Sequence, residues 1–97
     1  MEKRVVVTGI GVVSPVGNNV DAMWESIKAG KHGIAEITRF DLEGHKVTLA
    51  AEVKDFDFGD KRAARRLDIA DQYALVAARE AVEDSGIVSG ENVDPDR

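Results

Sequence analysis

The clearest chemical feature of this sequence is a cluster of four cations within six residues. This basic cluster consists of Lys61, Arg62, Arg65 and Arg66. Arg62, Arg65 and Arg66 are spaced three and four residues apart, so a helix would place them on one face. Guanidinium groups bind carboxylates and phosphates through paired hydrogen bonds. Cations at a helix start oppose the helix dipole, so the cluster favours binding of an external anion, with a solvated helix start as the alternative.

The sequence offers few groups for covalent or acid–base catalysis. It contains no cysteine, so neither a thiol nucleophile nor a thiolate zinc site can come from this chain. His32 and His45 lack the positioned partners that catalysis requires, and both are interpreted as loop residues. The carboxylates Asp41, Glu52 and those of residues 55–60 are interpreted as solvated loop charges, because no pair has metal-site spacing. We therefore expect no catalytic residue and no metal site among these residues.

A glycine-rich stretch near the start of the chain allows two interpretations. Three consecutive valines at residues 5–7 lead into glycines at positions 9, 11 and 17. This pattern predicts a strand covered on both faces that enters a tight turn. A dinucleotide-binding fingerprint would need glycine where Ser14 stands and a helix that opens at once, whereas Pro15 follows. A nucleotide-binding module is therefore the least favoured alternative.

The elements that would position these residues alternate between strand and helix. Hydrophobic periodicity predicts a helix over residues 19–29, a half-exposed strand over 47–53 and one long helix from 61 or 62 to 84. Asp60 can cap the start of the long helix, and Gly86 can end it. One side of this helix is rich in small residues and would let a sheet or another helix approach closely; it comprises Leu67, Ala70, Ala74, Ala77, Ala78 and Ala81.

The aromatic residues are interpreted as packing groups. Trp24, the only tryptophan, is expected to anchor a core or to pack at a dimer interface, because tryptophan is usually buried. Phe56 and Phe58 alternate with aspartates and are expected to pin a loop. They do not form a base-stacking platform, because no basic residues interleave them closely.

An ordered series of motifs resembles the β-ketoacyl-acyl-carrier-protein synthases, and their type II enzymes in particular. The series covers nearly all of the chain and is Val6-Val7-Thr8-Gly9-Ile10-Gly11, Ser14-Pro15-Val16-Gly17-Asn18, Ala29-Gly30-Lys31-His32-Gly33-Ile34, Arg39-Phe40-Asp41, Ala50-Ala51-Glu52-Val53-Lys54-Asp55-Phe56-Asp57, Arg65-Arg66-Leu67-Asp68, Gln72-Tyr73-Ala74 and Ala77-Ala78-Arg79-Glu80-Ala81. His32, Leu67 and residues 69–71 depart from the usual family residues. Side-chain detail of the family near residues 69–71 is therefore not carried over.

The resemblance implies an α/β fold and an acyltransferase activity. The expected fold is the amino-terminal part of a thiolase-like layered α-β-α-β-α arrangement, incomplete here, with residues 1–97 forming one portion of the amino-terminal domain without an internal boundary. The implied parent is a 3-oxoacyl-[acyl-carrier-protein] synthase II, which elongates acyl chains with malonyl-carrier protein in fatty acid biosynthesis. In that family a cysteine carries the acyl chain and two histidines assist decarboxylation. None can be assigned here, so we expect an inactive amino-terminal fragment and no cofactor.

The resemblance also implies partners. Members of the family dock an acidic carrier protein through a basic surface, and the matching stretch here is the basic cluster, with Lys61 as its weaker member. We expect acyl- and malonyl-loaded carrier protein as partners, and a homodimer in the parent. A non-catalytic ketosynthase-like partner subunit and a polyketide ketosynthase stay open as alternatives.

Composition narrows the setting in which such a protein would act. The net charge of −5 argues against non-specific binding to nucleic acid. No apolar run approaches the length of about 20 residues that spans a membrane, and no signal peptide opens the chain. A cytoplasmic protein without membrane or nucleic-acid partners is the resulting expectation.

Overall fold

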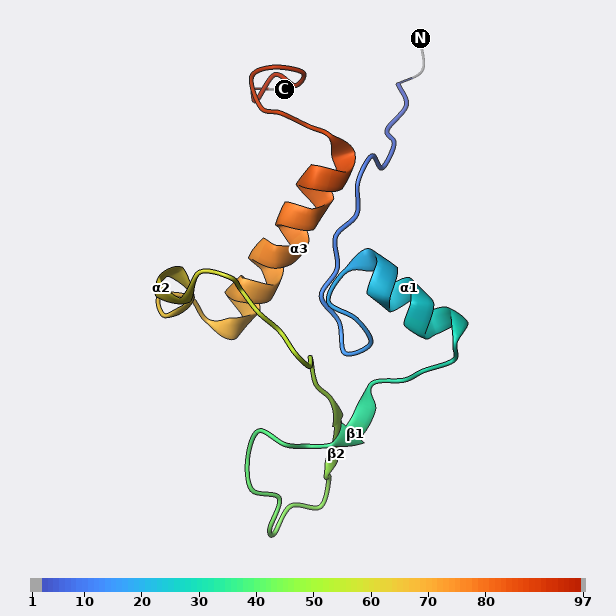
Figure 1. The fold of residues 1–97 in the computed structure, drawn as a ribbon, viewed down its shortest axis with the longest axis vertical. Coiled ribbons are helices and arrows are strands. Elements are labelled where there is room, and N and C mark those ends of the chain that lie inside the picture. The colour runs from blue at the N-terminus through green and yellow to red at the C-terminus, as the bar shows by residue number, and fades with distance from the viewer. Residues whose placement is uncertain (1–2, 97) are drawn as a thin grey trace.

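A computed structural model describes residues 3–96 and shows a mixed arrangement of helices and a small sheet (Figure 1). The elements in chain order are α1 (Val20–Lys28), β1 (Ile34–Glu36), β2 (Leu49–Ala51), α2 (Lys61–Ala64) and α3 (Ile69–Ser85). The two strands pair in antiparallel register, with Ile34 opposite Ala51 and Glu36 opposite Leu49. The predicted strand over 47–53 is thus present but shorter, and its partner β1 forms in a stretch for which no strand was predicted.

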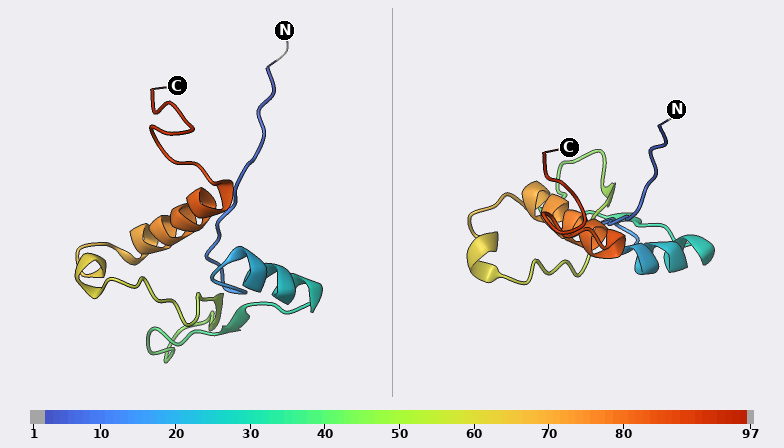
Figure 2. Two further views of the ribbon diagram at one scale, coloured as in Figure 1. Left: turned by 45° about the horizontal axis from the view of Figure 1, so that its top comes forward. Right: turned by 90° about the horizontal axis from the view of Figure 1, so that it is seen from above.

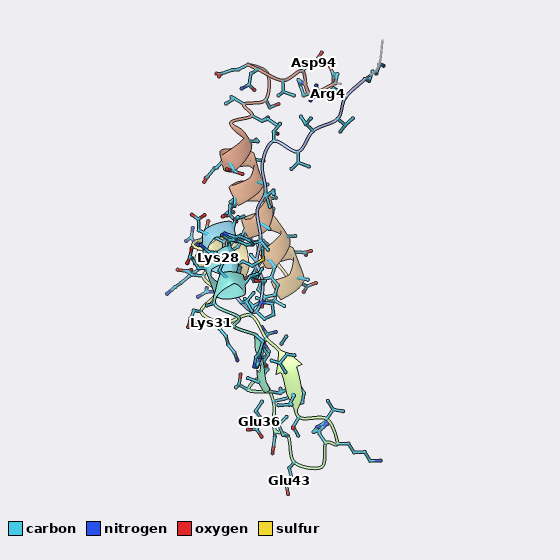
Figure 3. The ribbon with its side chains drawn as sticks, turned by 90° about the vertical axis from the view of Figure 1, so that its right-hand side faces the viewer. Arg4, Lys28, Lys31, Glu36, Glu43 and Asp94 are labelled. Carbon is cyan, nitrogen blue, oxygen red and sulfur yellow. The ribbon has the colours of Figure 1, made fainter. Side chains whose placement is uncertain are left out.

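The molecule is elongated and has little interior. Its principal extents are 59 × 35 × 22 Å and its radius of gyration is 17.6 Å, whereas a compact domain of this length has a radius of about 13 Å. Figure 3 shows Glu43 and Asp94 at opposite ends of the molecule. Among the described residues only Phe58 is a buried hydrophobic residue, and Trp24 is 55% exposed. The prediction of Trp24 as a core anchor is therefore wrong for this chain, because more than half of its surface is exposed and the cation over its ring, Lys28 Nζ at 5.9 Å from the centroid, is itself a surface group.

The valine-rich segment is extended but does not form the expected buried strand. Residues 5–7 pair with no other strand in the described part of the chain, and Val5 and Val7 are 98% and 80% exposed. A strand buried on both faces needs neighbouring strands and two covering layers. The single sheet described here is the two-stranded β1–β2 pair, so those neighbours are missing and the prediction of a buried strand is wrong.

The first helix begins and ends close to where the sequence predicts. Asn19 has extended backbone and its side chain accepts a hydrogen bond of 2.8 Å from the Ala22 amide, which is the usual arrangement at a helix start. Gly30 follows the helix in the left-handed conformation, with φ of +73°, as expected for a helix terminator. The predicted helix over residues 19–29 is confirmed as α1.

The expected long second helix is interrupted. α2 stops at Ala64, residues 65–68 form a turn, and α3 begins at Ile69 after Asp68, whose backbone is extended. The end of α2 tightens into i→i+3 bonds, because the Arg66 amide donates to Ala63 and the Leu67 amide donates to Ala64. A single continuous helix from residue 61 is therefore wrong, although Asp60 at its start and Gly86 at its end are confirmed as caps.

The small residues of α3 allow the N-terminal segment to lie directly on the helix (Figure 2). A Cβ atom built on Gly11 would lie 1.8 Å from the carbonyl oxygen of Ala77, and one built on Gly9 would lie 2.3 Å from that of Ala81. The α3 carboxylates reinforce this contact, because Asp84 accepts a 3.0 Å hydrogen bond from the Ile10 amide. A close backbone approach to the alanine-rich side is thus confirmed, but the neighbour is the extended N-terminal segment and not the sheet or helix that was predicted.

We expect the isolated chain not to unfold cooperatively, because its apolar segments are exposed and its sheet has only two strands. The measurement is thermal unfolding by circular dichroism together with the amide region of the proton NMR spectrum. The expected result is a gradual loss of helical signal and poor amide dispersion. A sharp transition with well-dispersed amides from the monomer would contradict this expectation.

Candidate functional site

The structure brings the four cations of the basic cluster together on one short stretch of chain. Lys61 and Arg62 lie in α2, Arg65 is its C-cap residue, and Arg66 lies in the turn that follows. All four are exposed, and none forms an ion pair with another residue in the range 3–96. Their positive charge is therefore available to an external anion.

The helix cap at Asp60 and the buried ring of Phe58 hold the basic cluster in place. Asp60 accepts hydrogen bonds of 3.0 and 3.2 Å from the Arg62 and Ala63 amides, so its carboxylate offsets the unfavourable charge at the helix start. Phe58 lies two residues before this cap and is 7% exposed. The guanidinium carbon of Arg79 lies over its ring, 4.8 Å from the ring centroid. The predicted pinning role of Phe58 is confirmed.

An open groove of about 470 Å³ borders the basic cluster. It is lined by Asp60, Arg62, Ala63, Arg66 and Leu67. Two cations, Arg62 and Arg66, therefore accompany two apolar side chains, Ala63 and Leu67, along the groove. Such a surface suits an acidic partner that also presents an apolar side chain, because charge steers the encounter and apolar contact adds to its lifetime.

The turn that carries the arginines is tied to α3 by Gln72. Its Nε2 atom donates hydrogen bonds of 3.1 Å to the carbonyl oxygens of Ala64 and Leu67. Next to it, Tyr73 packs edge-on against Phe56 with ring centroids 4.7 Å apart. In the sequence Gln72 stands out only as part of the motif Gln72-Tyr73-Ala74, because nothing local to residue 72 indicates which carbonyls its side chain reaches.

Glu52 is the exception among the carboxylates that were predicted to be solvated loop charges. Its side chain is only 9% exposed. It accepts hydrogen bonds of 2.9 Å from Lys54 Nζ and from Thr38 Oγ1. The Lys54 hydrogen bond is the main cause that lowers the pKa of Glu52 to about 2, and the Thr38 bonds add to it. The prediction is wrong here because β2 brings Glu52 against residues that follow β1.

The two histidines are surface loop residues, as predicted. His32 Nδ1 accepts a 3.3 Å hydrogen bond from the Ile34 amide, and the His45 ring lies 5.4 Å from that of Phe40. Residues 3–96 contain no group of three or more His, Cys, Asp or Glu side chains that could hold a metal ion. No helix within the described range is long and apolar enough to cross a membrane.

The glycine-rich stretch is occupied by protein groups. The near contacts of Gly9 and Gly11 are atoms of α3, all of them backbone atoms except Ser85 Cβ. Glu80 accepts hydrogen bonds from the Val12 amide at 2.9 Å and from the Val20 amide, at the start of α1, at 3.0 Å. A pyrophosphate would need those glycines and that helix start to be open, so the geometry disfavours the nucleotide-binding alternative.

Comparisons with known proteins agree with one another and cover most of this chain. A family model described as "Beta-ketoacyl synthase, N-terminal domain" matches residues 2–97. The 3-oxoacyl-[acyl-carrier-protein] synthase 2 of Staphylococcus aureus (strain COL) is 52% identical over 93% of this chain and 22% of its own length. The protein of the same name from Coxiella burnetii is 48% identical over 98% of this chain and 24% of its own length.

A solved structure gives the same result for the fold. "The ishigamide ketosynthase/chain length factor" matches with a TM-score of 0.68 and 39% identity, over 86% of this chain and 21% of that one. The incomplete α/β fold inferred from the sequence is therefore confirmed. This chain spans about a fifth of the length of the curated relatives it matches, and the matched residues include the basic cluster.

Proposed function

Because this chain belongs to the β-ketoacyl synthases and matches their N-terminal domain, we propose that it is the N-terminal part of a 3-oxoacyl-[acyl-carrier-protein] synthase, called the parent synthase below. The observation that carries the proposal is 52% identity to a relative of that name over 93% of the chain. In fatty acid biosynthesis the parent synthase extends an acyl group by the two-carbon unit that malonyl-carrier protein supplies. One carbon dioxide and one free thiol leave in this condensation.

The basic cluster is the proposed docking surface for the acyl- and malonyl-loaded carrier protein. Three observations support this assignment: the four cations are exposed, they form no ion pairs within the described chain, and two of them, Arg62 and Arg66, line a groove that also has apolar side chains. Exposed charges on one face accelerate association with an oppositely charged partner and make it sensitive to salt. Lys61, Arg62, Arg65 and Arg66 are thus carrier-protein-binding residues in this proposal, rather than catalytic ones.

The chemistry of condensation is assigned to parts of the parent synthase outside this chain. Transfer of the acyl group needs a nucleophile, and this sequence has no cysteine. His32 and His45 are exposed loop residues without carboxylate partners in the described range. The parent synthase is further proposed to be a cytoplasmic homodimer.

A second candidate is a non-catalytic ketosynthase-like subunit or a polyketide ketosynthase. It is favoured by the solved relative whose printed name includes a chain length factor, which is 39% identical. The curated relatives at about 50% identity favour the first proposal more strongly.

The test is to incubate the purified parent synthase with acyl- and malonyl-carrier protein and to measure carbon dioxide release and the 3-oxoacyl product. We expect turnover from the parent synthase and none from residues 1–97 alone, because those residues lack the thiol. A parent that produces no 3-oxoacyl product, but raises the rate of an added active synthase, would overturn the first proposal in favour of the second. Turnover by residues 1–97 alone would refute the assignment of the chemistry to other parts of the parent.

A further inference from the structure

The basic cluster lies partly outside regular helix, so its orientation depends on a few specific contacts. Arg65 and Arg66 follow the last residue of α2, and the backbone is extended at Asp68 before α3 begins. The helical hydrogen-bond ladder of α2 is therefore not continuous with that of α3. The Asp60 cap holds the start of the segment of residues 61–68. The end of this segment is held by a different contact.

Gln72 supplies that contact. It lies in the first turn of α3, and its half-buried side chain reaches back across the turn to two carbonyl oxygens at 3.1 Å, those of Ala64 and Leu67. These carbonyls bracket the two arginines in the sequence. A primary amide nitrogen carries two hydrogens, so one Gln72 side chain can donate to both at once.

We propose that Gln72 is a positioning residue for carrier-protein docking: it fixes the 65–68 turn on α3 and so sets the direction in which Arg65 and Arg66 present their guanidinium groups. This inference rests on the proposed docking function of the basic cluster. Paired hydrogen bonds from guanidinium to carboxylate are sensitive to orientation. A turn that is held in one geometry loses less conformational freedom when the partner binds, which strengthens the complex.

The matched pair of variants is Gln72→Leu and Asn92→Leu, both in the parent synthase. Leucine is close in size to glutamine and donates no hydrogen bond. Asn92 is a second amide that bridges a turn, beyond the other end of α3, where it donates to the Gly86 carbonyl at 2.9 Å and accepts from the Val88 amide at 2.8 Å. Removing it tests the general cost of losing such a bridge away from the basic cluster.

The assay compares an acyl group on carrier protein with the same acyl group on a small thiol, over a series of salt concentrations. For Gln72→Leu we expect KM for the carrier-bound substrate to rise about fivefold with kcat unchanged, because only the encounter surface is loosened. The rate with the small thiol should stay the same, and the dependence of kcat/KM on salt should become shallower. Asn92→Leu should leave both substrates unchanged.

The outcomes separate this inference from the docking proposal on which it rests. If reversing the arginine charges lowers only the carrier-bound reaction while Gln72→Leu does not, docking stands and the role of Gln72 is refuted. If the charge reversal lowers both reactions equally, the docking proposal itself fails. An equal loss for both substrates in Gln72→Leu would make Gln72 a residue of the fold alone. Gln72→Met is the second variant, and failure of both variants to fold would likewise overturn the inference.

Discussion

Replacing Arg62, Arg65 and Arg66 together by glutamate is expected to lower kcat/KM of the parent synthase for carrier-protein-bound substrate by about 100-fold at low salt. Each exposed contact contributes little by itself, so single substitutions should have modest effects. Reversing all three charges replaces attraction by repulsion within one short exposed segment, which slows association. The effect should shrink as salt is added, because screening shortens the range of the interaction.

The measurement compares the carrier-bound substrate with the same acyl group on a small thiol, which should react at the wild-type rate. The control variant reverses three other exposed cations, Arg4, Lys31 and Lys46, and thus changes the net charge equally. We expect little effect from it, since a local surface rather than total charge guides docking. Similar losses in the control variant, or losses with both substrates, would show that the basic cluster is not the docking surface.

Gly11→Ala is expected to destabilise the parent synthase by about 3 kcal/mol or more. The new Cβ atom would lie 1.8 Å from the Ala77 carbonyl oxygen and 2.7 Å from the Ala81 amide nitrogen. These are backbone atoms of α3, so no side-chain rotation can relieve the overlap. The N-terminal segment would have to move off the helix, and the hydrogen bonds of its amides to α3 carboxylates would be lost with it.

The matched control is Gly44→Ala. Gly44 has φ of +81° and no atom within 4 Å of an added Cβ, so its substitution costs only the strain of a left-handed backbone, about 1–2 kcal/mol. Denaturant midpoints and soluble yield of the two variants give the comparison. If Gly11→Ala is no more destabilising than Gly44→Ala, the close packing of the N-terminal segment on α3 is not retained in the parent synthase.

The sequence alone determined the features that depend on neighbouring residues. Asp60 and Gly86 mark helix ends correctly, because a cap is a contact between a side chain or a left-handed backbone and amides or carbonyls a few residues away. The presence of the basic cluster and its exposure follow from the same short range of sequence. The family also follows from the sequence, since the ordered motifs extend along nearly the whole chain.

Only the tertiary structure decided which segments and side chains are buried and which stay exposed. Extended valines at residues 5–7 become a buried strand only where other strands and layers flank them, and residues 3–96 supply none. The burial of Glu52 depends on Thr38, which is brought beside it by strand pairing.

The segment of residues 61–68 shows the same division within the candidate site. Its four cations can be read from the sequence, but the break between α2 and α3 cannot, because residues 61–84 have an uninterrupted helical pattern. The break is stabilised by two hydrogen bonds that the Gln72 side chain donates, to the carbonyl of Leu67 five residues away and to that of Ala64 eight residues away. The N-terminal segment depends on contacts at still longer range, between Val12 and Glu80, 68 residues apart. Local propensity carries no information about such contacts, because they exist only once the chain has folded back on itself.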